Sequence, residues 1–318
     1  MPLLLKEDLK FFFSTLRKAF NIFQKNDPLR LAGATAFFTN FALPPILIIL
    51  IRLFGMFTDR RLLVTHLFER LNNILDDESI AQIRLTLRNI RGIDQAWYIT
   101  LFSFIFFLFV ATTLFNVIKN SLEQIWNIAM KDKKGIVNTL KSRAISVTII
   151  LLAGILFLFG LLADSVQAII GSYLKTNSPS FELVITSIIN QIIFVIIVTA
   201  WFSILFRFLT NGRPTWRAAI SGGLLTGCLF TAGKYILRIL LPLSNISNIY
   251  GSAGSIIVIM LFVFYSSLIF YFGASFIKAL SVGRETPIVP KNGAFAYELT
   301  EVENEIEEII ANKKGEAK

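Results

Sequence analysis

The sequence predicts an all-α fold: a polytopic membrane protein with six transmembrane helices, preceded by an amphipathic N-terminal helix and followed by a short cytoplasmic C-terminal tail. Of its 318 residues, 54% are hydrophobic, 16% are charged and 31 are phenylalanine. A soluble domain cannot bury that much apolar surface. The apolar residues are also gathered into segments of about 20 residues or more, the length that crosses a bilayer. Six such segments are present, at about 30–51, 96–118, 144–170, 183–206, 217–241 and 249–279.

These segments divide the chain into three parts. Residues 1–28 are predicted to form a cytoplasmic amphipathic helix, residues 29–282 the membrane domain, and residues 283–318 a cytoplasmic tail. Residues 52–95 form an extracytoplasmic loop inside the membrane domain. The first 28 residues mix Phe and Leu with Lys and Arg, so no cleavable signal peptide is predicted there.

The orientation follows from the distribution of lysine and arginine. Twenty-one of the 31 basic residues fall on the side that carries both termini, and 10 fall on the other side. Cytoplasmic loops hold the excess of basic residues, so both termini are predicted to be cytoplasmic. The 52–95 loop is basic too, but six carboxylates leave it nearly neutral. The net charge of +10 is therefore a topology signal, and no nucleic-acid partner is expected.

Residues 4–25 have the pattern of an amphipathic helix, with one apolar face and Lys or Arg elsewhere. This suits a helix in the cytoplasmic headgroup layer. Packing against the cytoplasmic end of the bundle is an equally good interpretation. The apolar face is formed by Leu9, Phe12, Phe13, Leu16, Phe20 and Phe23.

The first span contains the stretch TNFALPPILI. Pro44 and Pro45 lack the amide hydrogens that would bond carbonyls one turn earlier. Those carbonyls lie near the bilayer midplane, beside the polar side chains of Thr39 and Asn40. An interrupted helix at this depth is a known kind of transporter site. The alternative is a structural kink satisfied by a neighbouring helix.

Two further spans place polar groups inside the apolar layer. Asn190 and Gln191 in the fourth span are either interhelical contacts or substrate contacts. Lys234 of the fifth span and Asp164 of the third lie at comparable depth. They either form an intramembrane ion pair or extend separately toward the headgroups.

Small residues recur at helical spacing in the last two spans, which predicts close helix packing. In the fifth span Gly223 and Gly227 are four residues apart. In the sixth, five residues spaced 4, 7, 4 and 7 apart share one helix face: Gly251, Ser255, Phe262, Ser266 and Gly273.

The chain is poor in residues for catalysis or metal binding. It has one cysteine, Cys228, inside an apolar segment, and one histidine, His66, outside the spans. This excludes a disulfide framework, a thiolate metal site and a histidine-based triad. No catalytic residue, metal site or cofactor is expected.

Four blocks in order resemble the YihY/BrkB family of bacterial inner-membrane proteins. They are AGATAFFTNFALPPILIIL, FNVIKNSLEQIWNI followed by LKSRAIS, RPTWRAAISGGLLTGCLFTAGKYIL, and YGSAGSIIVIMLFVFYSSLIFYFGASF. The resemblance implies a six-helix, multi-pass inner-membrane protein with both ends cytoplasmic. Many relatives carry Gly-Ala-Glu where this chain has Gly273, Ala274 and Ser275, which puts ion coupling through that carboxylate in doubt.

The expected function is that of a transporter or translocator of a lipid or other lipophilic envelope component. The alternative is a scaffold for envelope assembly that does not transport. Members of the family have also carried a ribonuclease label, but the cytoplasmic side offers no histidine for that chemistry. We therefore expect no enzyme. Membrane lipid is the expected partner, and assembly into a homo-oligomer is left as an open alternative.

Overall fold

The computed structural model describes most of the membrane region and part of what flanks it. The described residues are 2–54, 64–69, 80–81, 83–85, 97–131, 179–243, 249–250, 253–291 and 293–298, with single positions at 144, 148, 152 and 155. The predicted third span at 144–170, apart from those single positions, lies outside them. So do most of the 52–95 loop and the tail from residue 299.

The described chain is mostly helical, as the sequence predicts. Three of its helices are long and apolar enough to cross a membrane, over Gln191–Phe208, Trp216–Leu237 and Ile256–Gly283. These correspond to the predicted fourth, fifth and sixth spans. The long helices are α1 (Pro2–Lys25), α2 (Pro28–Phe54), α5 (Trp97–Trp126), α7 (Pro179–Phe208), α8 (Trp216–Leu243) and α10 (Gly254–Gly283).

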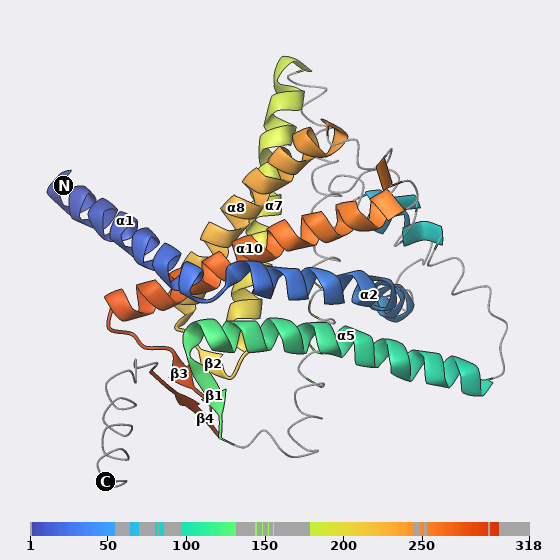
Figure 1. Ribbon diagram of the computed structural model, residues 1–318. Helices are drawn as coiled ribbons and strands as arrows, with labels where there is room; N and C mark the ends of the chain where they lie inside the picture. Colours follow the sequence, from blue (N-terminus) through green and yellow to red (C-terminus); the bar gives the residue numbers. More distant parts are fainter. Residues whose placement is uncertain are drawn as a thin grey trace, which may run out of the picture.

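Helix α10 is the centre of the described bundle. It contacts α1, α2, α5 and α8, while α7 packs against α8 on the far side (Figure 1). The contacts show that α8 and α10 run antiparallel, because Gly222 faces Ile277 and Gly233 faces Tyr265. One end of the bundle therefore brings together the ends of α5, α7 and α10 and the start of α8, and we call it the strand end.

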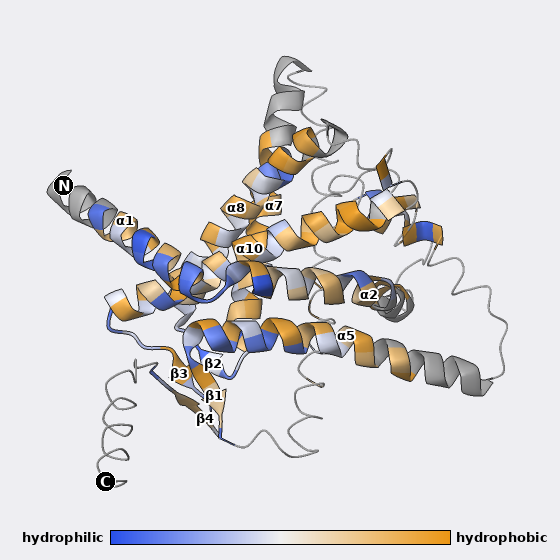
Figure 2. Ribbon diagram, in the orientation of Figure 1, coloured by the Kyte–Doolittle hydropathy of each residue, from blue (hydrophilic) through white to orange (hydrophobic). Residues whose placement is uncertain are grey.

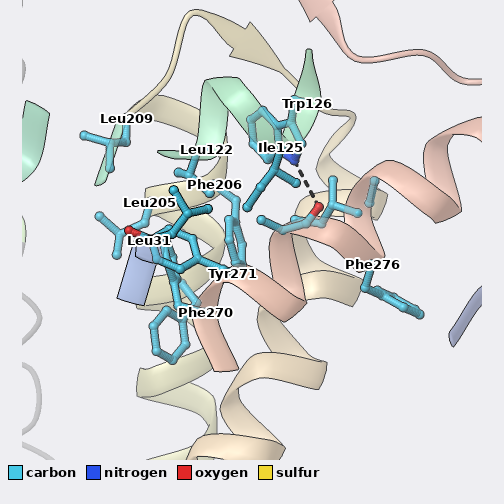
Figure 3. Close-up of a cluster of buried hydrophobic side chains, with 14 of the residues drawn as sticks. Leu31, Leu122, Ile125, Trp126, Leu205, Phe206, Leu209, Phe270, Tyr271 and Phe276 are labelled. Carbon is cyan, nitrogen blue, oxygen red and sulfur yellow. Dashed lines mark hydrogen bonds between the residues drawn. The ribbon is translucent and has the colours of Figure 1, made fainter. Parts of the chain in front are cut away.

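The strand end holds the main hydrophobic core (Figure 3). The rings of Phe206 and Phe270 stack with centroids 4.8 Å apart. Beside them Trp126 is 4% exposed, and its indole N–H donates to the carbonyl oxygen of Ala274 at 3.0 Å. The buried indole thus has its polar atom satisfied, as buried tryptophans usually do.

The sequence did not predict the four short strands at this end. Strand β1 (Ile128–Met130) pairs antiparallel with β4 (Ala294–Ala296), and β2 (Gly212–Arg213) pairs antiparallel with β3 (Val289–Pro290). Both ladders join the segment after α10 to the loops that follow α5 and α7. The fold is therefore helical with two small sheets that fasten residues 289–296 to the bundle.

Helix α1 packs against α10 with a face that coincides only in part with the predicted one. Thr15 and Ala19 are buried, and the Phe23 ring lies 5.7 Å from that of Phe272. In contrast, Phe13 and Phe20 are 62% and 49% exposed. Part of the predicted apolar face thus points away from the bundle, and polar and apolar residues alternate along α1 (Figure 2).

The other members of the predicted α1 face are divided between the two environments. Phe12 is exposed at 41%, although its ring lies 5.9 Å from that of Phe276. Leu16 packs against the core, and the side chain of Leu9 lies outside the described residues. Contact with α10 selects the buried face, because the small residues Thr15 and Ala19 let the two helices approach.

Candidate functional site

Helix α2 continues through the proline pair. It is helical from Pro28 to Phe54, and Pro44 is half-buried. Thr39 donates to the carbonyl oxygen of Thr35 in its own helix at 2.7 Å. The hydroxyls of Thr35 and Tyr271 lie 2.5 Å apart and connect α2 to α10. The hydroxyls of Thr35 and Thr39 are thus used for contacts inside the protein.

The remaining predicted residues on α2 add little to a site. Asn40 is half-buried, and the side chain of Pro45 lies outside the described residues. The α-helical backbone across both prolines means that the expected interruption of the first span is not an unwound segment.

A second polar cluster lies between α7 and the second half of α8. Tyr235 donates its hydroxyl hydrogen to Gln191 Oε1 at 2.9 Å. The Lys234 ammonium lies 4.1 Å from the centre of the Phe194 ring, within the range of a cation–π contact. Asn190 belongs to α7, but its side chain is not among those described, and Asp164 lies outside the described residues.

These clusters are on different sides of the central helix. The α2 cluster, with Thr39 and Asn40, lies on the helix that packs against α10 and α5. The cluster with Gln191 and Lys234 lies between α7 and α8. The described residues therefore do not bring the predicted polar path together into one cavity.

The glycines of α8 and α10 are positions of close helix contact. A methyl group on Gly223 would overlap the side chain of Ser203, and one on Gly227 would lie 2.9 Å from Thr199 Oγ1. A methyl group on Gly273 would overlap Thr226 Oγ1. These glycines allow α7, α8 and α10 to approach at distances that a larger residue would prevent.

The other predicted packing residues lie in or beside α10. Ser266 is half-buried and donates to the carbonyl oxygen of Phe262 at 2.7 Å. Ser255 lies in the first turn of the helix, with its side chain outside the described set, and Gly251 lies outside the described residues.

Two apolar grooves flank the first half of α8, and the sequence did not predict either. The first is bounded by α1, α8 and α10 and has a volume of about 520 Å³. The second lies between α7 and α8 and has a volume of about 480 Å³. Leu224 lines both grooves and is 49% exposed. Such grooves depend on how two or three helices lie relative to one another, which no local pattern reveals.

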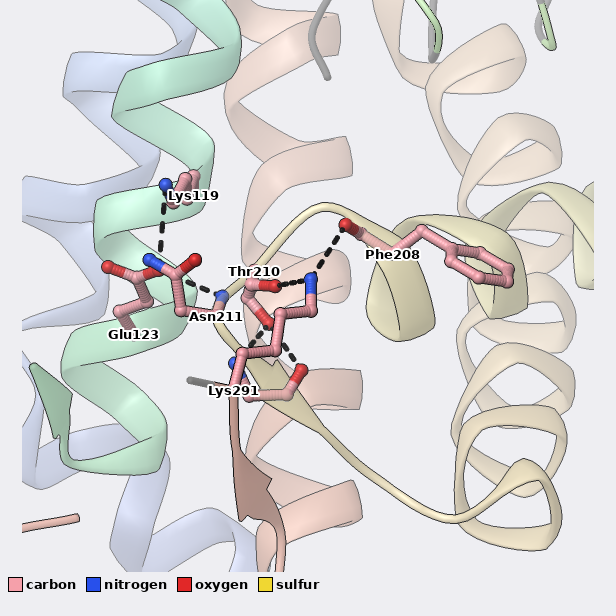
Figure 4. A network of polar contacts seen from close by, with 7 residues as sticks. Lys119, Glu123, Phe208, Thr210, Asn211 and Lys291 are labelled. Atoms are coloured by element: carbon pink, nitrogen blue, oxygen red, sulfur yellow. Dashed lines mark hydrogen bonds and ion pairs between the residues drawn. The ribbon is translucent and has the colours of Figure 1, made fainter. Parts of the chain in front are cut away.

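A network of polar contacts lies at the strand end and connects its elements (Figure 4). Glu123 is 9% exposed, accepts the backbone N–H of Asn211 at 3.0 Å and lies 3.9 Å from the ammonium of Lys119. Lys291 donates to the carbonyl oxygens of Thr210 and Phe208. The network joins α5, the loop after α7 and the segment after α10, so it stabilises the arrangement of these elements.

No metal centre is formed by the described residues. Among them, no three His, Cys, Asp or Glu side chains gather where a metal ion could bind. The acidic residue of the network, Glu123, already pairs with a lysine and a backbone amide.

Comparison with known proteins identifies the family. The family model described as "Virulence factor BrkB" matches residues 19–293. The chain belongs to the BrkB family. Comparison with curated proteins and with solved structures gives no match.

The BrkB match extends from within α1 to the segment just before β4. It includes the walls of both grooves on α7, α8 and α10. The α1 residues of the first groove, Phe11, Phe12 and Thr15, precede the matched range. Within that range Ser275 is fully buried and donates to the carbonyl oxygen of Tyr271 at 2.9 Å, so this position holds a neutral contact within α10.

Proposed function

We propose that this BrkB-family protein translocates a lipid or another lipophilic component of the envelope. The observation that carries the proposal is the pair of apolar grooves, about 520 and 480 Å³, on either side of α8. Ligand sites for apolar molecules are concave and lined mainly by hydrophobic side chains. Because α8 is apolar enough to span a membrane, both grooves would face lipid.

The proposed membrane arrangement follows the sequence. Six helices cross the bacterial inner membrane, and both termini are cytoplasmic, as the lysine and arginine distribution favours. The strand end then lies at the cytoplasmic surface, together with α1. The proposed partner is membrane lipid, without nucleic acid, and the protein acts without enzymatic chemistry.

The polar residues between the helices have a smaller part in this proposal than the sequence predicted. Thr35 and Tyr271 contact each other, and Gln191 contacts Tyr235. We propose that they hold helices together, because their hydrogen bonds are made within the protein. The lipid would instead move along the outer surface of α8, where the grooves lie.

A scaffold without transport activity is the second candidate. The close contacts at Gly223 and Gly273 favour it, because a tightly packed bundle resists the helix movements that alternating access needs. Translocation along an outer groove needs smaller movements, and for that reason we favour transport.

Reconstitution tests the proposal directly. Purified protein in liposomes should speed the passage of fluorescent phosphatidylglycerol between leaflets, measured by dithionite quenching of the outer leaflet. Protein-free liposomes and liposomes with heat-inactivated protein provide the baseline. A rate equal to that baseline for phosphatidylglycerol and for a panel of other envelope lipids would favour the scaffold.

A further inference from the structure

The groove between α1, α8 and α10 differs at its two ends. The antiparallel contacts of α8 with α10 place Ser221 near Phe276 and Leu280, and place Cys228 toward the other end. Arg284, one turn beyond Leu280, therefore stands at the strand end of the groove. The opposite end, around Cys228, lies inside the apolar span of α8.

The walls between these two ends are apolar. Phe276 and Leu280 are almost fully buried on α10, and Leu224 lines the α8 side. The hydroxyl of Thr15 on α1 already donates to the carbonyl oxygen of Phe11 at 2.8 Å. The middle of the groove therefore offers a ligand mostly hydrocarbon to contact.

The length of the groove fits one leaflet. From Ser221 to Cys228 the helix rises about 10 Å at 1.5 Å per residue. Half of the hydrocarbon core of a bilayer is about 15 Å thick. A groove that begins at the end of α10 and runs down α8 therefore extends across most of one leaflet.

Arg284 is held at the mouth of the groove. Its backbone N–H donates to the carbonyl oxygen of Leu280 at 3.0 Å, and its guanidinium lies 5.8 Å from the centre of the Phe11 ring. Among the described residues, no carboxylate pairs with this guanidinium. Arg217, exposed in the first turn of α8, lies four residues before Ser221 and so on the same helix face.

We propose that this groove binds a membrane lipid with an anionic phosphate headgroup. An acyl chain lies between α1, α8 and α10, and the phosphate contacts Arg284, with Arg217 contributing positive charge. Arginine suits this role because its guanidinium donates several hydrogen bonds to phosphate oxygens. This inference names the class of lipid that the proposed translocation would act on, and it rests on the proposed function only for what the bound lipid is for. Occupancy of the groove can be measured without any transport.

Photocrosslinking tests the site. The full-length protein in nanodiscs is irradiated with phosphatidylglycerol that carries a diazirine near the end of one acyl chain, or with the matching phosphatidylcholine. Mass spectrometry then quantifies label on the tryptic peptide 218–234, which contains the α8 wall. Both probes carry a phosphate, but the choline ammonium of phosphatidylcholine makes that headgroup neutral and is repelled by the two arginines. The site should therefore favour the anionic probe by about three- to tenfold.

Two matched variants assign the preference to the groove. Arg284→Gln should bring the ratio of the two probes close to one, whereas Arg213→Gln, an exposed arginine away from the groove, should leave it unchanged. Equal labelling by both probes in the wild-type protein would overturn the inference, as would an unchanged ratio in Arg284→Gln. Charge-dependent labelling without lipid flux would refute transport alone, and flux without charge-dependent labelling would refute this site alone.

Discussion

An alanine at Gly223 tests the close contact between α7 and α8. Its methyl group would overlap the Ser203 side chain and lie 2.8 Å from the backbone oxygen of Thr199. The side chain can rotate, but the backbone atom moves only if α7 moves. Overpacking of this kind costs about 1–3 kcal/mol, and the higher helix propensity of alanine offsets about 1 kcal/mol of that. We expect the free energy of unfolding to fall by up to about 2 kcal/mol.

Gly33 provides the matched control, because the same substitution on α2 meets nothing within 4 Å. There alanine should raise the free energy of unfolding by about 0.4–1 kcal/mol. Both variants are measured in mixed micelles by titration with sodium dodecyl sulfate, followed by circular dichroism. The expected difference between the two variants is about 0.4–3 kcal/mol. Equal free energies of unfolding for Gly223→Ala and Gly33→Ala would show that α7 and α8 are not in close contact at Gly223.

Three further predictions concern the strand end, the contact of α2 with α10, and the topology. Trp126→Phe should lower the free energy of unfolding by about 1–3 kcal/mol in the same titration, because it removes the indole N–H that donates to the Ala274 carbonyl and puts a smaller ring in a buried site. The exposed Trp216→Phe should change it by less than about 0.5 kcal/mol, and equal effects would contradict the buried hydrogen bond. Tyr271→Phe should cost about 1 kcal/mol, because the hydroxyl that contacts α2 is lost, and an unchanged midpoint would argue against that contact. Green fluorescent protein fused after residue 298 should fluoresce and alkaline phosphatase inserted after residue 175 should be active; the reverse pattern would refute the proposed orientation.

The long helices could be predicted from the sequence because membrane spanning is a local property. About 20 consecutive apolar residues must form a helix in lipid, whatever surrounds them. For that reason α7, α8 and α10 lie where the apolar segments predict them. Gly223 and Gly273 could also be singled out from spacing alone, although their contact residues, Ser203 and Thr226, could not.

The grooves and the buried face of α1 depend on contacts between distant segments. A helix with aromatic residues on several sides could bury any one of several faces. In α1, contact with α10 buries the face with Thr15 and Ala19 and leaves Phe13 and Phe20 exposed. Similarly, the groove exists because α1 crosses α8 and α10 near Arg284. No periodicity in one segment carries that information.

The short strands escaped prediction for a different reason. Ladders of two or three residues are too short to show the alternating pattern of a strand. Glu123 could have been noticed as a carboxylate near the end of an apolar helix. Its partner at Asn211 is 88 residues away and becomes apparent only in the folded chain.

Lipid flux in a groove-filling variant tests the central claim most directly. Leu224 lines both grooves and Leu240 lies elsewhere on α8, yet the two leucines are similarly exposed, at 49% and 53%. Leu224→Trp should reduce the passage of fluorescent phosphatidylglycerol between leaflets to the rate of protein-free liposomes, and Leu240→Trp should keep the wild-type rate. Wild-type flux in Leu224→Trp would contradict lipid movement along α8.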